Sequence, residues 1–387
     1  MRKAIQLIQT HEYTLARNYL DAVLISPFIS NVQRSRGYYF RGFSYFSQNL
    51  FVSAAQDYAR SLDFDPGNKS TLSAVAHFYS QGLGTKKDSA LAFDFFLKAA
   101  RAGHQVSQYR VGRAYLEGLG VEANRKKARY WFETSANPTS PSDKEYPPAI
   151  VQLAAIYRSE TEPDVYKAEN LYQQAVALGS TDALVGLAYM HLNGEFSAVT
   201  TEAPNLDLAA DYFRQAAGAG SPAGQAGLGY MYQTGRGLNM STQEAAKWYK
   251  RAAKAGNGFA QLRLGEISLG NRSFKNSQVA LSWFQKAASQ GILNARNSLA
   301  WLLATSKHAA LRNGNQATEI ARGVVAESIT PSYLDTLAAA LAEKGDFDAA
   351  IAMQKRAIEN LEKPDGTSGD KFRERLAAYQ KQKPWRD

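Results

Sequence analysis

The apolar and polar residues of this chain follow a repeating pattern, and each repeat has the form of two short amphipathic helices. Residues 222–257 show it most clearly, with the sequence PAGQAGLGYMYQTGRGLNMSTQEAAKWYKRAAKAGN. The first half is an apolar helix pattern that ends at Gly235 and Gly237. The second half begins at Ser241 and stops at Gly256. These start and stop signals predict a helix–turn–helix hairpin.

An aromatic or apolar pair marks the second helix of six such hairpins. The pairs are Phe95–Phe96, Trp131–Phe132, Leu171–Tyr172, Tyr212–Phe213, Trp248–Tyr249 and Trp283–Phe284. Four residues after the first member of each pair comes a pair of small residues, such as Ala252–Ala253. Because residues four apart share one face of a helix, the large and small side chains are neighbours there. We expect Trp248 to be a buried aromatic between hairpins.

A glycine follows the small pair in most of these hairpins. Glycine suits the left-handed residue that ends a helix. The positions are Gly103, Gly179, Gly220, Gly256 and Gly291. A hairpin this short cannot bury its own apolar face, so it must stack on neighbouring copies. The repeat therefore predicts an all-α protein, an α-solenoid of stacked helix–turn–helix hairpins.

The motif resembles the Sel-one-like repeat, a longer relative of the tetratricopeptide repeat. The matching residues are Leu228, Gly229, Tyr232, Gly235, Gly237, Ala246, Trp248, Tyr249, Ala252, Ala253 and Gly256. The resemblance covers residues 69–291 and implies a right-handed superhelix in a bacterial protein. It also implies a scaffold, because the family serves many different partners.

The same patterns divide the chain into four expected segments. Residues 1–68 resemble two tetratricopeptide hairpins, of which the first lacks its early motif residues. Residues 69–291 hold six Sel-one-like hairpins. Residues 292–363 give a degenerate hairpin and another tetratricopeptide-like hairpin. Residues 364–387 give a polar linker and a basic helix that is expected to cap the open end.

The composition argues against most enzyme and metal sites. The chain has no cysteine, which excludes a disulfide, a thiolate metal site and a cysteine nucleophile. The five histidines are scattered, without ligand spacing. Glycine pairs such as Gly235 and Gly237 recur once per hairpin without a preceding strand, so they are expected in turns and not in phosphate loops. We expect no catalytic residue, no metal and no cofactor, and the protein is not expected to be an enzyme.

The net charge of +10 favours an acidic partner. The densest basic run is Arg125-Lys126-Lys127 with Arg129. It lies at the start of a second helix, which is expected to face solvent, so direct nucleic-acid binding is not expected. No apolar run approaches the length of a transmembrane helix.

The first helices of the hairpins carry the candidate site, because in the tetratricopeptide superfamily these helices line a concave groove. A groove rich in aromatic and arginine side chains has the composition of a binding hot spot. An alternative for each aromatic side chain is packing between neighbouring hairpins. The residues carried over from the resemblance are Tyr39, Phe43, Phe46, His77, Tyr109, Arg113, Arg158, Tyr189, Tyr230, Gln233, Glu266 and Trp301.

The predicted function is a non-catalytic adaptor that holds a peptide segment or a partner protein in this groove. One alternative is a periplasmic scaffold for envelope, exopolysaccharide or motility assembly that binds an acidic polymer. A remote alternative is a hydrolase. The end hairpins could also pair two copies into a homodimer. The sequence as written has no export signal and predicts a cytoplasmic protein, or a periplasmic one where a signal peptide precedes Met1.

Overall fold

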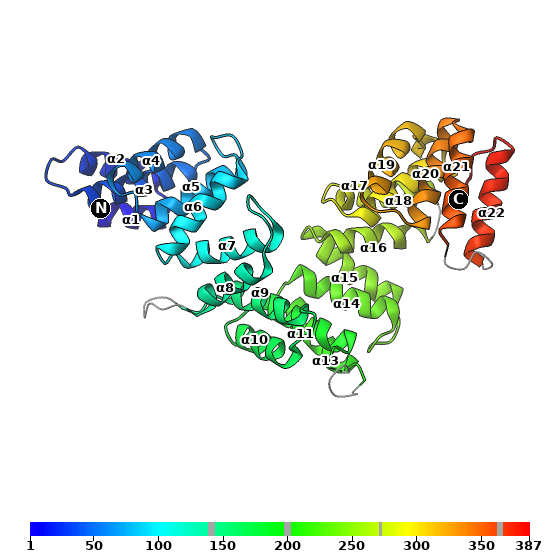
Figure 1. Ribbon diagram of the computed structural model, residues 1–387, viewed down its shortest axis with the longest axis horizontal. Coiled ribbons are helices and arrows are strands. Elements are labelled where there is room, and N and C mark those ends of the chain that lie inside the picture. The colour runs from blue at the N-terminus through cyan, green and yellow to red at the C-terminus, as the bar shows by residue number, and fades with distance from the viewer. Residues whose placement is uncertain (138–143, 197–202, 271–272, 362–366) are drawn as a thin grey trace. The chain divides into compact units, whose positions relative to one another are not determined.

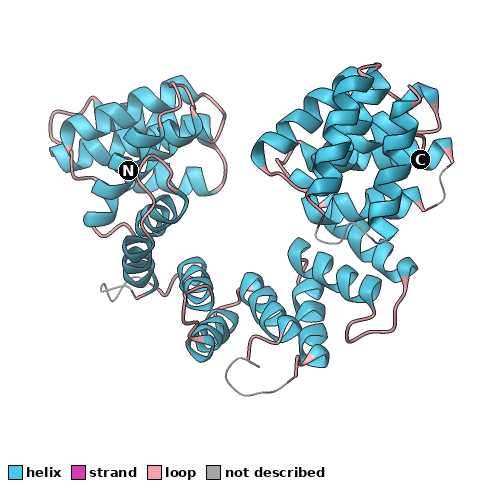
Figure 2. Ribbon diagram, turned by 45° about the vertical axis from the view of Figure 1, so that its right-hand side comes forward, coloured by secondary structure: helices cyan, strands magenta, loops and turns pink. Residues whose placement is uncertain are grey.

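The chain folds into α-helices arranged as consecutive hairpins (Figure 1). A computed structural model describes residues 1–137, 144–196, 203–270, 273–361 and 367–387. Within these ranges there are α-helices and one short 3-10 helix but no strand (Figure 2). The predicted all-α fold built from helix–turn–helix hairpins is confirmed.

The described residues form two compact units, Met1–Gly186 and Leu187–Asp387. The helices of the first unit are α1 (Arg2–Gln9), α2 (Tyr13–Leu24), α3 (Asn31–Phe46), α4 (Phe51–Phe64), α5 (Lys69–Gln81), α6 (Ser89–Arg101), α7 (Gln105–Glu117), α8 (Arg125–Ala136), α9 (Pro147–Arg158) and α10 (Val165–Ala177). The boundary between the units falls within α11 (Thr181–Asn193).

The second unit continues the same alternation of first and second helices. Its members are α13 (Leu206–Gly218), α14 (Pro222–Thr234), α15 (Thr242–Lys254), α16 (Gly258–Leu269), α17 (Phe274–Ala288), α18 (Leu293–Thr305), the 3-10 helix η1 (Ala309–Leu311), α19 (Gly314–Glu327), α20 (Pro331–Lys344), α21 (Phe347–Glu359) and α22 (Thr367–Gln380). Within each unit the helices pack chiefly on their neighbours in sequence, as expected when each repeat contacts only adjacent repeats.

The glycines predicted to end the second helices all have left-handed backbone. The φ angles of Gly103, Gly179, Gly220, Gly256 and Gly291 lie between 77° and 90°. The Gly235 and Gly237 pair between α14 and α15 also has positive φ, 71° at each residue. These glycines therefore terminate helices and form turns, as the sequence predicted.

The second helices α8, α10, α13, α15 and α17 each bury one aromatic side chain almost completely. Tyr249 on α15 and Phe284 on α17 are 0% and 1% exposed. Their rings lie against glycines of the first helices, so that a Cβ on Gly265 would come 2.3 Å from Phe284 Cε1. The prediction that Trp248 is the buried aromatic was wrong. Trp248 is only partly buried and carries the Arg251 guanidinium 4.6 Å from its ring centroid, because the adjacent Tyr249 points into the core.

Several predicted loops are only partly described. Residues 138–143 of the Pro/Ser insertion, 197–202 of the insertion after α11, and 362–366 of the polar linker lie outside the described residues. After the linker, α22 packs against α21, and Tyr379 near its end is 0% exposed.

Candidate functional site

The candidate aromatic residues of α3 pack partly into the first unit. Tyr39 lies 5.9 Å from the ring of Tyr58, and burial raises the pKa of its hydroxyl. Phe43 packs against a small cluster formed by α1 and α2. Phe46 lies 5.7 Å from the ring of Phe78. Each of these candidate side chains is half-buried, so each contributes to packing while keeping part of its surface open.

A cationic cavity lies beside α7 in the same unit. Its volume is about 250 Å³. Lys87, Arg110 and Arg113 supply positive charge, while Phe93 and Phe96 of α6 supply apolar surface. Arg113 forms an ion pair with Glu117 at 2.6 Å. Within the described residues Arg110 has no ion-pair partner, so this cavity keeps an unneutralised cation beside apolar rings.

Arg110 acts electrostatically on His77 and Tyr146, and Tyr109 packs on Tyr146. The pKa of His77 is lowered, first by burial and then by the charge of Arg110. Tyr109 and Tyr146 meet edge to face with ring centroids 5.5 Å apart, and burial raises the pKa of Tyr146. The structure therefore brings the candidates His77, Tyr109 and Arg113 into one region. Sequence reasoning missed Arg110 and Tyr146 there.

Arg158 lies apart from this region, at the end of α9. One of its guanidinium nitrogens is 3.4 Å from the hydroxyl of Tyr172, and its Cζ is 5.9 Å from that ring centroid. The position on α9 that corresponds to Arg113 on α7 holds Ala155, since Tyr157 matches Tyr115 in the repeat. This internal alignment is the sequence signal that could have shown that Arg158 does not occupy the position of Arg113.

A second cluster lies on the first helices of the second unit. Tyr189 on α11 is 36% exposed and packs edge to face on Phe213, with ring centroids 5.1 Å apart. Burial, and less strongly the neighbouring Tyr230 on α14, raise the pKa of the Tyr189 hydroxyl. These two half-open rings form an aromatic surface.

Polar groups border this aromatic surface. The buried Tyr249 hydroxyl donates to Gln233 Oε1 at 2.7 Å, which fixes the Gln233 side chain. Glu266 on α16 forms an ion pair with Arg263 at 2.7 Å. We name Tyr189, Tyr230, Gln233, Arg263 and Glu266 the tyrosine cluster. Sequence reasoning named four of these residues and missed Arg263, which lies on the same helix as Glu266.

Trp301, the last candidate in sequence order, contacts the end of the chain. Its indole N–H donates to Asp387 Oδ2 at 3.1 Å. The adjacent cavity has a volume of about 340 Å³ and includes Glu266, Lys307 and His308 in its lining. Trp301 is therefore not an open groove residue in this structure, because residues from the end of the chain lie against it.

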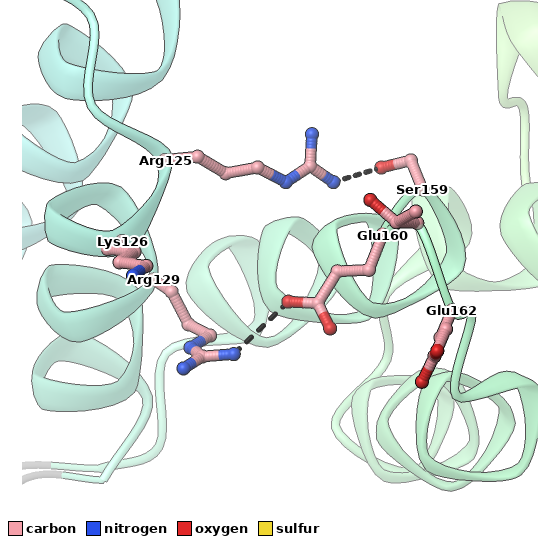
Figure 3. A pocket seen from close by; sticks show the side chains of 7 residues that line it. Arg125, Lys126, Arg129, Ser159, Glu160 and Glu162 are labelled. Carbon is pink, nitrogen blue, oxygen red and sulfur yellow. Dashed lines mark hydrogen bonds and ion pairs between the residues drawn. The ribbon is translucent and has the colours of Figure 1, made fainter.

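The basic run at the start of α8 contributes to a wide hollow with the end of α9 (Figure 3). Arg125 donates to Ser159 Oγ at 2.5 Å and to the carbonyl oxygen of Ile156 at 3.0 Å. Arg129 forms an ion pair with Glu160 at 3.1 Å. Two of the cations are thus engaged in holding neighbouring helices, and Glu160 and Glu162 add negative charge to the same hollow. This mixed charge does not form the continuous basic surface that a nucleic-acid backbone requires.

No group of three or more His, Asp or Glu side chains in the described ranges is placed to hold a metal ion. None of the helices described there combines the length and apolar composition required to cross a bilayer.

Comparison with known proteins gives a family and several relatives. A family model described as Sel1 repeat matches residues 72–104, 105–137, 147–180, 181–221, 222–257 and 258–292. The matched ranges cover more than half of the chain and coincide with the hairpins from α5 to α17.

Two curated relatives come from yeasts. Chitin synthase regulatory factor 3 of Schizosaccharomyces pombe is 24% identical over 332 residues, which cover 82% of this chain and 30% of that protein. Chitin synthase regulator SKT5 of Saccharomyces cerevisiae is 27% identical over 293 residues, which cover 64% of this chain and 41% of that protein. The chain thus spans less than half of the length of either relative.

Among solved structures, a Sel1 repeat protein from Oxalobacter formigenes is similar to this chain. It is 26% identical with a TM-score of 0.52, and the match covers 64% of this chain and 98% of that one. The likeness supports the hairpin architecture over the matched part.

Proposed function

The chain belongs to the Sel1 repeat family, whose repeats make it a protein-interaction scaffold, and we propose that it binds an extended segment of a partner protein along its first helices. The observation that carries this proposal is the tyrosine cluster. There, two half-open tyrosine rings lie beside a fixed amide and an ion pair. Tyrosine and arginine side chains in partly desolvated surroundings are the residues most enriched in binding hot spots.

The positive charge of the cationic cavity in the first unit favours a partner segment that carries an acidic side chain. Lys87, Arg110 and Arg113 line it, and Phe93 and Phe96 lower the local access of water. A carboxylate that enters gains charge-assisted hydrogen bonds, which are stronger than neutral ones. The partner segment is therefore expected to combine apolar side chains with at least one Asp or Glu.

The names of the curated relatives favour a protein partner over a polymer. Both are named as regulators of chitin synthase, so the names describe control of an enzyme. A non-enzymatic adaptor is consistent with those names. We propose by analogy that the partner of this chain is an enzyme or an assembly protein, and that the chain itself carries out no reaction.

Partner capture by defined variants tests the proposal. Immobilised wild-type chain and the Tyr189→Ala, Tyr230→Ala double variant are compared, and retained proteins are identified by mass spectrometry. The matched control is Tyr19→Ala with Tyr130→Ala, which removes two exposed tyrosines from the second helices α2 and α8. The expected result is a protein retained by wild type and by the control but lost by the Tyr189, Tyr230 variant.

Measurements of folding then distinguish loss of the binding site from a general loss of structure. Circular dichroism and melting temperature of the double variant are expected to stay near the wild-type values, since both rings are partly exposed. Equal retention by all three proteins would overturn the role of the tyrosine cluster. A marked drop in melting temperature would show that the two rings are chiefly core residues.

We further propose that a second copy of the chain is a partner for the N-terminal hairpin. The turn after α2 exposes Phe28 at 94% and Ile25 at 83%, beside Val32 at 56%. Exposed apolar side chains that gather in this way are typical of interaction surfaces. Light scattering is expected to give a dimer for wild type and a monomer for the Ile25→Ser, Phe28→Ser variant. A monomeric wild type at all concentrations would contradict this pairing.

A further inference from the structure

The last residues of the chain have no regular secondary structure and reach the end of α18. Residues 381–387, which we name the C-terminal segment, leave α22 after Gln380. The backbone N–H of Asp387 donates to the carbonyl oxygen of Thr305 at 2.9 Å. A guanidinium nitrogen of Arg386 is 3.5 Å from the carbonyl oxygen of Ala304. These carbonyls belong to the last turn of α18, where a helix leaves its acceptors without internal partners, so the segment supplies the donors that α18 lacks.

Three consecutive side chains of the C-terminal segment each meet a different group on this face. Trp385 packs on a hydrophobic core cluster of the second unit, and the Arg375 guanidinium lies 5.8 Å from its ring centroid. Arg386 forms an ion pair with Glu343 at 2.7 Å. Asp387 accepts the indole N–H of Trp301 at 3.1 Å. The face thus has a separate receptor for an aromatic, a cationic and an acidic side chain in succession.

The receptor groups also have partners outside the C-terminal segment. Glu343 is also bound by Arg312 at 2.9 Å, and its side chain is 13% exposed. Arg375 lies 5.3 Å from the ring centroid of Trp301 and is anchored by an ion pair with Asp335 at 2.7 Å. A site whose groups are fixed in advance spends less conformational entropy when a ligand binds.

The space beside Asp387 continues past the C-terminal segment. The cavity there, of about 340 Å³, is lined by Glu266, Ser277, Trp301, Lys307 and His308 among others. Glu266 belongs to the tyrosine cluster, so the face of α18 and that cluster adjoin within the second unit. The space that Asp387 borders therefore reaches Glu266 of that cluster.

We propose that this face of α18 and α20 is a binding site for an extended segment of a partner protein that carries an aromatic, an arginine and an acidic residue in succession, and that the C-terminal segment occupies it on the same chain. The sequence of the C-terminal segment indicates the specificity of the site, because this segment is a peptide that already occupies it. The inference goes beyond the proposed function, since it names a second site and the chemistry of its ligand.

Occupation by the chain's own segment masks the site from a free peptide. A tethered ligand competes at an effective concentration on the order of millimolar. The apparent affinity for a free peptide falls in proportion to the fraction of chains whose site is open. Weakening the tethered contacts is therefore expected to raise the affinity for the same sequence supplied in solution.

A labelled peptide with the sequence KQKPWRD tests the proposal by fluorescence anisotropy. The peptide is amidated so that only its side chains and backbone bind. The release variants are Arg386→Ala and the double variant Trp385→Ala with Arg386→Ala. We expect each release variant to bind the peptide about tenfold or more tightly than wild type. The matched control, Lys383→Ala, changes an exposed residue of the same segment and is expected to bind as wild type does.

Variants of the α18 and α20 face and of the peptide distinguish specific binding from non-specific attraction. Trp301→Phe keeps an aromatic ring at this position but removes the indole N–H, so in the Arg386→Ala background it is expected to weaken peptide binding. Trp283→Phe on α17 is the matched control. A peptide with Ala in place of its Trp and Arg is expected not to bind.

Three results would overturn the proposal. One is a folded Arg386→Ala variant, checked by circular dichroism, that binds the peptide no better than wild type. Another is equal binding by the Trp301→Phe and Trp283→Phe variants. The third is a wild-type dimer that dissociates on addition of the peptide, because that would assign the face to the C-terminal segment of a second copy.

Discussion

The Cα of Gly229 lies so close to the ring of Tyr249 that a Cβ at residue 229 would come 2.8 Å from Tyr249 Cδ1. This contact joins the first and second helices of one hairpin, α14 and α15. The same relationship recurs between Gly112 and Phe132, where the distance is 2.7 Å. The glycine of the repeat is therefore required by the buried aromatic on the facing helix.

Replacement of Gly229 by alanine is predicted to destabilise the chain. Overpacking in a well-packed interior costs about 1–3 kcal/mol. The better helix propensity of alanine offsets about 1 kcal/mol of this. The net loss, up to about 2 kcal/mol, is measured by urea unfolding. Gly218→Ala is the control, because a Cβ there meets nothing within 4 Å, and it is expected to be neutral or stabilising by up to about 1 kcal/mol.

The two aromatic residues at positions 248 and 249 are predicted to differ in their contribution to stability. Tyr249→Ala removes a side chain that is 0% exposed and is expected to cost about 3–5 kcal/mol. Trp248→Ala removes a partly exposed ring and is expected to cost about 1–2 kcal/mol. Tyr249→Phe isolates the hydrogen bond to Gln233 and is expected to cost about 1 kcal/mol. Denaturant unfolding of the three variants checks the order, and a larger loss for Trp248→Ala than for Tyr249→Ala would reverse the assignment of the buried ring.

The protonation of His77 is predicted to depend on Arg110. Burial and, less strongly, the Arg110 charge hold the pKa of His77 below its ordinary value of 6.5. The unfolded chain therefore binds this proton at a higher pH than the folded chain does. The contribution of His77 to stability is present above pH 6.5 and is lost as the pH falls below 6.5 towards the folded pKa.

An NMR titration of the His77 ring measures this coupling. Arg110→Gln is expected to raise the pKa of His77 only partway towards 6.5, because burial is the larger cause of the shift. Arg101→Gln, at the exposed end of α6, is the control. An unchanged His77 pKa in Arg110→Gln would show that the two side chains do not interact. His77 would then no longer belong to the region proposed around the cationic cavity.

The hairpin pattern of the fold could be predicted from the sequence because its signals are local. Gly256 ends α15 with a φ of 90°, and Ser241 begins the same helix by accepting a hydrogen bond from the backbone N–H of Glu244. Each signal acts within a few residues of its own position. A repeated local signal is then reinforced by every copy in which it appears.

The candidate site could be predicted only in part, because its contacts join distant residues. Tyr189 and Tyr230 were found from their shared position in the repeat, and they do lie together. Arg110 was missed because its neighbours His77 and Tyr146 belong to other helices. The contact between Trp301 and the C-terminal segment could not be predicted, since this segment has no repeat pattern that would place it.

The ion pair between Asp335 and Arg375 yields the last prediction. The two residues are 5% and 7% exposed, and Arg375 Nε donates to Asp335 Oδ1 at 2.7 Å. Gln354 donates to the same oxygen at 2.8 Å. Burial raises the pKa of Asp335, and Arg375 opposes that rise, so the carboxylate depends on its partners to remain charged. Removing one member of such a pair is expected to cost about 3–5 kcal/mol.

A double-mutant cycle measures this dependence. Arg375→Met leaves a buried carboxylate without its cation, and Asp335→Leu leaves a buried guanidinium without its anion. The double variant leaves neither charge and is expected to be more stable than either single variant, because the desolvation cost of both ions is removed together. Additive losses in denaturant unfolding would show that the two residues act independently. A lower stability of the double variant than of both single variants would contradict the assignment of the pair as a mutually dependent buried contact that joins α22 to α20.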